Sequence, residues 1–483
     1  MNDGRSDKPR SVVRRGNHAV VIGASIAGLC AGRVLSDFYD QVTLFDRDTL
    51  PEHPANRAAV PQGRHVHILM SRGAQEFDAL FPGLLDDMVA AGVPILEDQP
   101  GSIHFGAAGH VLGIPTELEE TFTTYVPSRP QLEWQIRRHA ARLPNVAIRQ
   151  RAVSAPRFDA AAQRVTGVVL DPPDGAEPEF VPADLVVDAT GRGTRLPVWL
   201  QEWGFERPIE DTVDVGIGYA TQQLRIPDGL IEEKVVVAGA SRAQPVGIGM
   251  LFYEDGTWGM TTFGVGKVEP PRTFSEMCDV ADAVLPEHAA AIRQAEPIGK
   301  IAFHKYPTSR WRRYDKLTRY PTGIVPFGDA VVSFNPTYGQ GMTMTSLQAG
   351  HLRRALESPD ADIAGQLNRA TAKTTYPVWT MNAIGDQAFH NASGPMPRWY
   401  RPVGNLFEQF LGAAETEPVL AEWFLRRFSL LDSLYMVPSA RIIDRTVRHN
   451  MRCWLAERRE KRAEARRQRN GYLVSARSRS GSR

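Results

Sequence analysis

GIVPFGDAVVSFNPTYGQGMTMT, residues 323–345, joins an apolar run, a Gly-Asp turn and a second glycine-rich turn. Gly323 to Phe327 is typical of a buried strand that carries Asp329 to the carboxyl end of a parallel sheet, where ligands of open α/β sheets bind. Pro336 is incompatible with a regular helix, and apolar residues at helical spacing predict a helix that begins near Gly341. The unpaired N–H groups at that helix start carry roughly half a positive charge, which favours a ligand that becomes anionic.

Another glycine-rich turn lies near the N-terminus, far from residues 323–345 in the sequence. His18 to Ile22 predicts a strand, residues 23–28 (GASIAG) form the turn, and small residues at helical spacing follow. This is the dinucleotide-binding fingerprint with Ser25 in place of the middle glycine. The next predicted strand, Gln41 to Phe45, ends at Asp46, where an acid meets a ribose 2′-hydroxyl. The acid favours FAD or NAD over NADP.

The two motifs together resemble the single-component (group A) FAD-dependent monooxygenases of the para-hydroxybenzoate hydroxylase fold. Gly328-Asp329-Ala330, Pro336 and Gly339-Gln340-Gly341-Met342 resemble the second FAD motif of that family. Residues 56–73, NRAAVPQGRHVHILMSRG, are especially similar to the epoxidases of polyether-ionophore biosynthesis, which are relatives of squalene epoxidase. The resemblance implies an α/β fold with a Rossmann-like FAD-binding domain of the GR2 type, an antiparallel-sheet substrate domain and a C-terminal helical region.

The resemblance also implies a set of cofactor contacts. The expected FAD-binding residues are Gly23, Ser25, Ala27, Gly28, Asp46, Arg47, Arg57, Arg129, Asp188, Gly191, Gly328, Asp329, Pro336, Gly339, Gln340, Gly341 and Met342. Arg57 corresponds to an arginine beside the flavin ring, and Arg129 to one at the start of a helix. Asp188 and Gly191 correspond to the family's Asp-Gly motif, in which Thr194 and Arg195 replace the usual Ser and Arg.

The chemistry that this family implies comes mainly from its cofactors. FAD would be reduced by NADPH or NADH, which binds transiently because no second dinucleotide fingerprint follows, and would then react with O2 to give a C4a-hydroperoxide. Arg57 and Tyr338 are the candidate catalytic side chains. Tyr338, next to the flavin motif, either orients substrate or cofactor or serves as a packing residue.

Short alternating segments between Thr212 and Lys267, with a hairpin signal at residues 254–257, predict an antiparallel sheet over the flavin and a mostly apolar pocket. The sequence shows no clear base that could activate a phenol. We therefore expect epoxidation or related oxygenation of an apolar, unsaturated specialised metabolite of the polyketide or terpenoid type. Aromatic hydroxylation on the same fold is the alternative, and an isoprenoid reductase or oxidase without oxygen insertion is a third reading.

The expected domain boundaries follow from the order of these motifs. They are a disordered leader (1–16), an FAD-binding domain (17–75, 125–205 and 300–357), a substrate domain (76–124 and 206–299), a helical region (358–457) and a basic, disordered tail (458–483). Apolar residues at positions 443, 447, 451 and 455 predict an amphipathic helix that docks on the chain's own domain in preference to a membrane surface.

Composition limits the remaining possibilities. The formal net charge of the 483 residues is +1, so no global field favours a nucleic acid. The 3 cysteines and the polar, basic N-terminus favour reduced thiols and a cytoplasmic protein. His65 and His67 have no third ligand at a suitable spacing, so no metal is expected. The oligomeric state is open.

Overall fold

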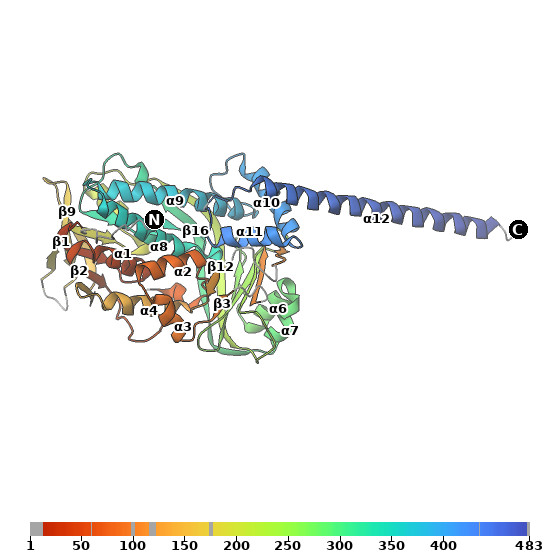
Figure 1. The fold of residues 1–483 in the computed structure, drawn as a ribbon, viewed down its shortest axis with the longest axis horizontal. Helices are drawn as coiled ribbons and strands as arrows, with labels where there is room; N and C mark the ends of the chain where they lie inside the picture. The colour runs from red at the N-terminus through yellow and green to blue at the C-terminus, as the bar shows by residue number, and fades with distance from the viewer. Residues whose placement is uncertain are drawn as a thin grey trace, which may run out of the picture.

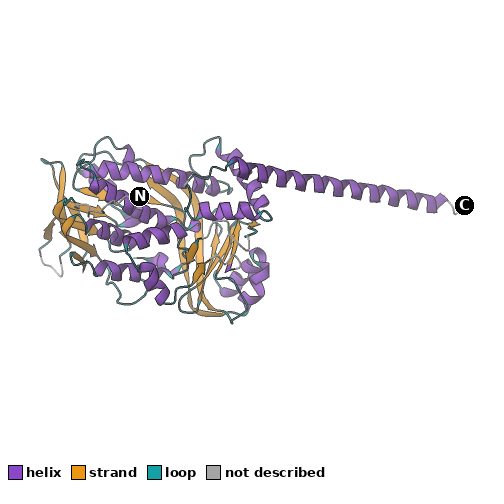
Figure 2. Ribbon diagram, in the orientation of Figure 1, coloured by secondary structure: helices purple, strands orange, loops and turns teal. Residues whose placement is uncertain are grey.

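The computed structural model describes residues 13–58, 60–97, 102–114, 122–172, 177–433 and 435–480. Most of the expected leader and the last residues of the expected tail lie outside these ranges. Figure 1 shows a body of sheets and helices from which one long helix projects. Figure 2 shows that strands occupy the middle of both halves of this body and that helices cover them.

A parallel sheet organises the nucleotide-binding half. Its 5 strands run in the order β17-β11-β1-β2-β7. Their bounds are β1 (Gly16–Ile22), β2 (Tyr39–Asp46), β7 (Val146–Gln150), β11 (Leu185–Asp188) and β17 (Ile324–Pro326). The predicted strands before the two glycine-rich turns are β1 and β17, and both are buried. A small antiparallel sheet of β8 (Val153–Asp159), β9 (Arg164–Leu170) and β10 (Glu179–Pro182) adjoins them.

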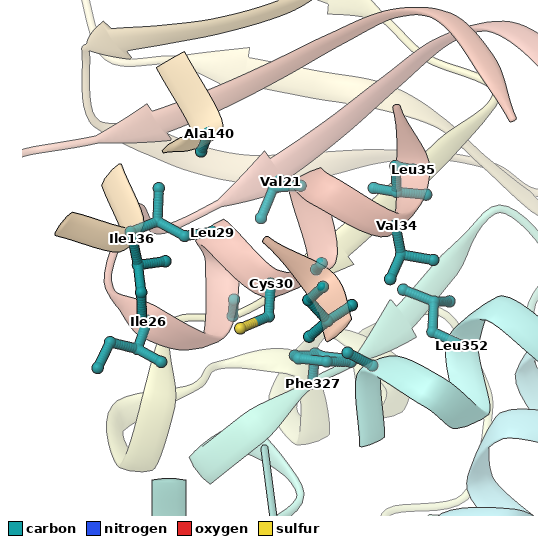
Figure 3. Close-up of a cluster of buried hydrophobic side chains, with 14 of the residues drawn as sticks. Val21, Ile26, Leu29, Cys30, Val34, Leu35, Ile136, Ala140, Phe327 and Leu352 are labelled. Atoms are coloured by element: carbon teal, nitrogen blue, oxygen red, sulfur yellow. The ribbon is translucent and has the colours of Figure 1, made fainter. Parts of the chain in front are cut away.

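Helices cover this sheet and close its core. They are α1 (Ile26–Leu35), α2 (Ser71–Leu80), α3 (Leu84–Ala90), α4 (Arg129–Ala141), α5 (Leu196–Glu202) and α8 (Gly341–Glu357). Figure 3 shows Val21 of β1, Leu29 of α1, Phe327 after β17 and Leu352 of α8 around the buried Cys30. The two glycine-rich motifs, far apart in sequence, therefore share one apolar core, which fixes their relative position.

A second, mainly antiparallel sheet forms the substrate half. Its order is β18-β16-β12-β15-β14-β13-β4-β5. The bounds are β4 (Ile103–Ala107), β5 (His110–Val111), β12 (Glu210–Arg225), β13 (Val235–Ala238), β14 (Val246–Phe252), β15 (Trp258–Gly264), β16 (Glu296–Arg312) and β18 (Val332–Ser333). The predicted hairpin at residues 254–257 joins β14 to β15. Two helices, α6 (Phe274–Val284) and α7 (Pro286–Arg293), pack on one face of the sheet.

Several short elements lie between these strands and helices. They are β3 (Ile95–Glu97), β6 (Thr123–Tyr125) and the 3-10 turns η1 (Pro61–Arg64), η3 (Gly191–Gly193), η4 (Tyr314–Lys316), η5 (Gly328–Ala330) and η6 (Pro336–Tyr338). The parallel sheet, the antiparallel sheet and the C-terminal helices confirm the predicted fold class.

Two expected domain boundaries are wrong. Residues 76–93 belong to the nucleotide-binding core, because Phe77, Phe81 and Met88 pack in the same buried cluster as α1 and α4. The stretch from 300 to Arg312 belongs to the substrate sheet, since β16 pairs along almost its whole length with β12. In both cases long-range packing overrides the order of the motifs along the chain.

The C-terminal region is helical. Its members are α9 (Ile363–Asp386), α10 (Tyr400–Ala414), α11 (Pro418–Phe428) and α12 (Ala440–Ser480). Helices α10 and α11 pack against β4 through an apolar cluster that includes Phe105, Leu411 and Phe424. Among the described helices, none combines the length and apolar character needed to cross a bilayer.

Helix α12 corrects two expectations. The chain continues as helix through Ser480 instead of becoming disordered from residue 458. The amphipathic stretch also does not dock through its expected face, because Ile443, Val447 and Met451 are 51%, 52% and 55% exposed. Ile442 is the residue that anchors the start of the helix, in the cluster with α10 and α11. Figure 1 shows the remainder of α12 leading away from the body.

Candidate functional site

The first glycine-rich turn connects β1 to α1 and requires glycine at two positions. Gly23 has a φ of +103°, and a Cβ there would lie 2.8 Å from the carbonyl oxygen of Ala189. A Cβ on Gly28 would overlap the carbonyl oxygen of Gly23. The turn therefore lies against the end of β11 and leaves the N-terminus of α1 free to face a ligand, as the fingerprint predicts.

Asp46 lies at the end of β2, beside this turn. One carboxylate oxygen accepts a hydrogen bond of 2.8 Å from Ala24 N and lies 3.3 Å from a guanidinium nitrogen of Arg57. Asp46 and Arg57 are both buried, whereas the neighbouring Arg47 is exposed. The structure thus places Arg57 at the expected adenosine end of the site. It does not line the large cavity described below, and its expected contact with the flavin ring stays a prediction.

A second carboxylate, Glu133, explains where Arg57 lies. Arg57 Nε is 2.8 Å from Glu133, which also accepts a 2.9 Å hydrogen bond from Ser25 Oγ at the start of α1. Arg129 contacts the same carboxylate at 3.3 Å, and its Nε has no hydrogen-bond partner among the described residues. These side chains surround a small hollow next to Gly63. Glu133 was not among the residues predicted from the sequence, although its position one helical turn after Arg129 on α4 was a usable signal.

Asp188 occupies the end of β11 but is enclosed by its own turn. Its carboxylate accepts hydrogen bonds from the backbone N–H of Thr190 (3.1 Å) and from the hydroxyls of Thr190 (2.5 Å) and Thr194. Burial raises the pKa of Asp188, and these hydrogen bonds oppose the shift. The residue therefore holds the shape of the turn at Gly191, whose φ is +75°. It positions the site and is itself 0% exposed.

The Gly328-Asp329 turn meets the first motif directly. A Cβ on Gly328 would lie 2.7 Å from the Cβ of Ala27, so glycine permits the two turns to touch. The backbone N–H of Gly328 donates a 2.7 Å hydrogen bond to Gln348 of α8, which fixes the turn. In the part of the chain that the structure describes, the carboxylate of Asp329 has no hydrogen-bond partner. Burial raises the pKa of Asp329, while Arg192 and Arg129 lower it.

Helix α8 begins at Gly341, as predicted. No described atom outside its own neighbourhood would lie within 4 Å of a Cβ on Gly341, so space is open at this helix start. Gln340 is buried, and its Oε1 has no partner within the described ranges. Gly339 has a φ of +68° after the 3-10 turn that starts at Pro336. Met342 packs on the nucleotide-binding core.

A cavity of about 290 Å³ lies between the substrate sheet, the C-terminal helices and the segment that leads into α8. Its lining is mainly apolar and aromatic: Phe105, Val237, Ile248, Phe263, Met381, Phe389, Phe407, Leu411, Phe424, Phe428 and Met436. Residues 336–340 form another wall. Gln62 lines this cavity, and the next residue, Gly63, lines the small hollow at Arg129, so one backbone segment connects the two spaces.

Asp386, at the end of α9, is the main ionisable group in this cavity that sequence analysis missed. It is 1% exposed, and one carboxylate oxygen accepts hydrogen bonds from Asn335 (2.6 Å) and from the hydroxyl of Tyr338 (3.1 Å). Burial raises the pKa of Asp386 to about 7. Gly385 leaves the room for the Tyr338 hydroxyl, which a Cβ would overlap. An acid in the last turn of a helix opposes the helix dipole, and that was the available signal.

Three aromatic rings line a different part of the cavity. The ring of His65 lies 5.9 Å from Tyr219 and 5.6 Å from His304. Burial lowers the pKa of His65 to about 4, so its imidazole is neutral near neutral pH. The hydroxyl of Tyr219 is buried without a hydrogen-bond partner in the described chain. It is therefore free to bind a polar group of a ligand.

The described residues offer groups that fit FAD at three places. At one end Gly23, Gly28 and Asp46 form the dinucleotide turn, and the unpartnered carboxylate of Asp329 lies in the middle, beside Gly191. At the other end Gly341 faces open space at the large cavity's edge. Buried atoms of Arg129 and Gln340 in these segments have no partner among the described residues, and buried polar atoms require partners.

Comparisons with known proteins support this fold. Residues 394–460 match the family described as "Mycobacterium Rv3254 C-terminal domain". The chain is 68% identical over 456 residues to Protein Rv3254 of Mycobacterium tuberculosis, covering 92% of this chain and 96% of the relative. It is 25% identical over 361 residues to kynurenine 3-monooxygenase of Salinispora arenicola, with 68% and 70% of the two chains covered.

Among solved structures, the flavoprotein/dehydrogenase of Cytophaga hutchinsonii has a similar fold. The TM-score is 0.59 at 14% identity, and the match covers 86% of this chain and 94% of that one. The predicted flavoprotein fold is confirmed, and the monooxygenase named above agrees with the predicted enzyme class. None of these similarities extends to the epoxidase subtype.

Proposed function

This chain belongs to the family of Protein Rv3254 of Mycobacterium tuberculosis, and we propose that it is an FAD-dependent monooxygenase for an apolar, unsaturated small molecule. The observation that carries the proposal is the position of the large cavity. Residues 336–340, which lead into the start of α8, form one wall of it, and the other walls are mainly apolar. A water-poor pocket beside the redox-active end of a cofactor is what oxygen transfer to an apolar molecule requires.

The chain's own residues would hold the cofactor at three places. The turn at Gly23 and Gly28, together with Asp46, would bind the adenosine end. Asp329 would accept hydrogen bonds from the ribityl hydroxyls, and the N–H groups at Gly341 would stabilise negative charge on the ring. When bound and reduced by NADPH or NADH, FAD supplies the activation of O2.

Within the cavity, Asp386 and Tyr338 can move a proton. Because the pKa of Asp386 is raised to about 7, its carboxylate can accept a proton near neutral pH and release it again. Both side chains line the cavity, so a substrate hydroxyl can reach the pair directly or through Tyr338. Activation of a phenol toward an electrophilic oxygen depends on removing such a proton.

This pair favours aromatic hydroxylation as the specific reaction. The prediction of epoxidation depended on the absence of a clear base and on the resemblance to epoxidases, and Asp386 is a candidate for that base. The kynurenine 3-monooxygenase relative acts, by its name, on an aromatic substrate, which supports the same choice. Epoxidation of a polyketide-type or terpenoid-type alkene stays the second candidate because the cavity lining is apolar and the segment at residues 56–73 resembles that of epoxidases.

The deciding experiment is oxygen incorporation. Purified full-length protein would be reconstituted with FAD, reduced with NADPH or NADH, and supplied with ¹⁸O₂ and a panel of apolar phenols and alkenes. We expect ¹⁸O in a hydroxylated phenol, with substrate-stimulated consumption of the reduced nicotinamide. Label in an epoxide instead would select the second candidate.

Two outcomes contradict the proposal. Product formation without ¹⁸O would assign the protein to the flavin-dependent reductases or oxidases. Failure to bind FAD at micromolar concentration would remove the cofactor and, with it, the monooxygenase assignment. The Asp329→Ala variant serves as the matched control, because it should lose FAD while its large cavity is unchanged.

A further inference from the structure

Two buried histidines and a glutamate meet on the face of the substrate sheet that carries α6 and α7. His104 belongs to β4, Glu233 precedes β13, and His288 lies in the first turn of α7. One potential ligand atom from each residue lies within 4.8 Å of the others. Figure 1 shows α7 on the side of this sheet away from α1 and α4, so the group is separate from the flavin site.

The geometry of the group is close to that of a tetrahedral metal site. His288 Nε2 lies 3.2 Å from Glu233 Oε1. The rings of His104 and His288 lie 5.0 Å apart and are nearly perpendicular, at 77°. Zinc–nitrogen bonds of about 2.0–2.1 Å place neighbouring ligand atoms of a tetrahedron about 3.4 Å apart. Small side-chain rotations would bring all three ligand atoms to that spacing.

One unsatisfied nitrogen of the group points to a missing partner. His104 Nε2 is buried and makes no hydrogen bond to any described residue. A buried polar atom without a partner is costly, and a bound cation would satisfy an imidazole lone pair. By contrast, His110 forms an ordinary surface His–Glu pair. Its ring lies 2.6 Å from Glu415, the pair contains no second imidazole, and the two side chains are 30% and 43% exposed.

We propose that His104, Glu233 and His288 bind a divalent transition-metal ion of the zinc type. Two imidazoles and one carboxylate are a ligand set that suits Zn²⁺, whereas Mg²⁺ and Ca²⁺ prefer oxygen alone. Glu233 and the neighbouring Glu287, which interacts electrostatically with His104, add the negative charge that a cation needs. The ion would tie β4, the segment before β13 and α7 together, and one coordination position would be left for water.

Metal binding to the full-length protein tests the proposal. Chelator-treated protein would be titrated with Zn²⁺ and then dialysed, and bound metal would be measured per chain. Cys453→Ser would be present throughout, because its exposed thiol lies 3.3 Å from His449 and could hold zinc itself. We expect one Zn²⁺ per chain, a higher melting temperature with Zn²⁺, and at least a tenfold weaker affinity in His104→Ala and His288→Ala.

Two further variants make the result decisive. His110→Ala, from the ordinary His–Glu pair, should bind zinc as the parent protein does. Glu233→Gln keeps the size of the side chain and an oxygen near His288, so the variant should fold. Its affinity for Zn²⁺ should nevertheless be at least tenfold weaker than that of the parent protein. Equal affinity in Glu233→Gln and the parent, binding of no zinc, or stronger binding of Mg²⁺ than of Zn²⁺ would each overturn the assignment.

Discussion

The hydroxyl of Tyr338 lies 3.1 Å from a carboxylate oxygen of Asp386, on the wall of the large cavity. Tyr338 ends the 3-10 turn η6 before α8, and Asp386 ends α9, so the pair joins the flavin-binding motif to the C-terminal helices. Burial, and then the negative charge of Asp386, raise the pKa of Tyr338, which keeps its hydroxyl protonated. Asp386 is therefore the member of the pair that titrates near neutral pH.

Asp386→Asn should slow oxygenation of a phenolic substrate by about 10²-fold or more, because the amide cannot accept the substrate proton. The reduction rate of FAD should change much less. Single-turnover experiments would separate the two steps, and the rate in the parent protein should rise with pH through about 7. Tyr338→Phe is the control that keeps the carboxylate. A variant Asp386→Asn with the parent's pH profile would show that the carboxylate is structural.

Asp386 should also lower stability as the pH rises. Its folded pKa, about 7, is above its ordinary value of 3.8, so the folded state favours the protonated form. The resulting stability is complete below pH 4 and is lost between about pH 4 and pH 7, by at most about 1.4 kcal/mol per pH unit. Chemical denaturation of the parent and of Asp386→Asn across this range should show the slope only in the parent. Parallel curves would contradict this origin.

Arg57→Ala should reduce stability and FAD affinity together. Arg57 is 6% exposed and pairs with Asp46 and Glu133, so its removal leaves a buried carboxylate without its cation. Losing one partner of a buried pair typically costs about 3–5 kcal/mol. Denaturant unfolding and FAD titration would measure the two effects, with Arg57→Lys as the conservative control. Normal stability combined with slow flavin reduction would instead support the ring-side role that the sequence predicted.

Asp329→Ala should weaken retention of FAD by roughly tenfold or more, since the carboxylate has no partner in the described chain and is available for ribityl hydroxyls. Gel filtration followed by absorbance of the retained flavin would measure it. Asp159→Ala, an exposed acid on β8, should retain FAD like the parent. Equal flavin occupancy in both variants would exclude Asp329 from the cofactor site.

Gly28→Ala should strongly impair folding, because its Cβ would overlap backbone that cannot move away. Gly249→Ala is the matched substitution: a Cβ there meets no described atom within 4 Å, and it should be tolerated. Expression yield and melting temperature would distinguish the two. A stable Gly28→Ala protein would mean that the first turn differs from the one described.

The sequence predicted those parts of the fold that depend on neighbouring residues. Strand β1, the turn at Gly23, helix α8 at Gly341 and the hairpin before β15 each follow from local periodicity and glycine placement. The proximity of the Gly23 and Gly328 turns could also be anticipated, because the resemblance assigns both of them to one FAD.

Other parts depend on partners from distant segments. Glu133 determines where Arg57 lies, yet the two are far apart in sequence and come from different elements. Asp386 becomes part of the site only because the end of α9 packs against Tyr338. The expected domain boundary after residue 75, inside α2, is wrong because the apolar face of α2 could equally have covered either sheet. Packing, which no local pattern records, decides each of these cases.

Helix α12 has a consequence for measurements of particle size. Its 41 residues span roughly 60 Å at 1.5 Å per residue, and most of that length extends beyond the body. An elongated particle has greater frictional drag than a sphere of equal mass. A single chain should therefore elute early from a sizing column, and sedimentation velocity or light scattering is needed to distinguish a monomer from a dimer.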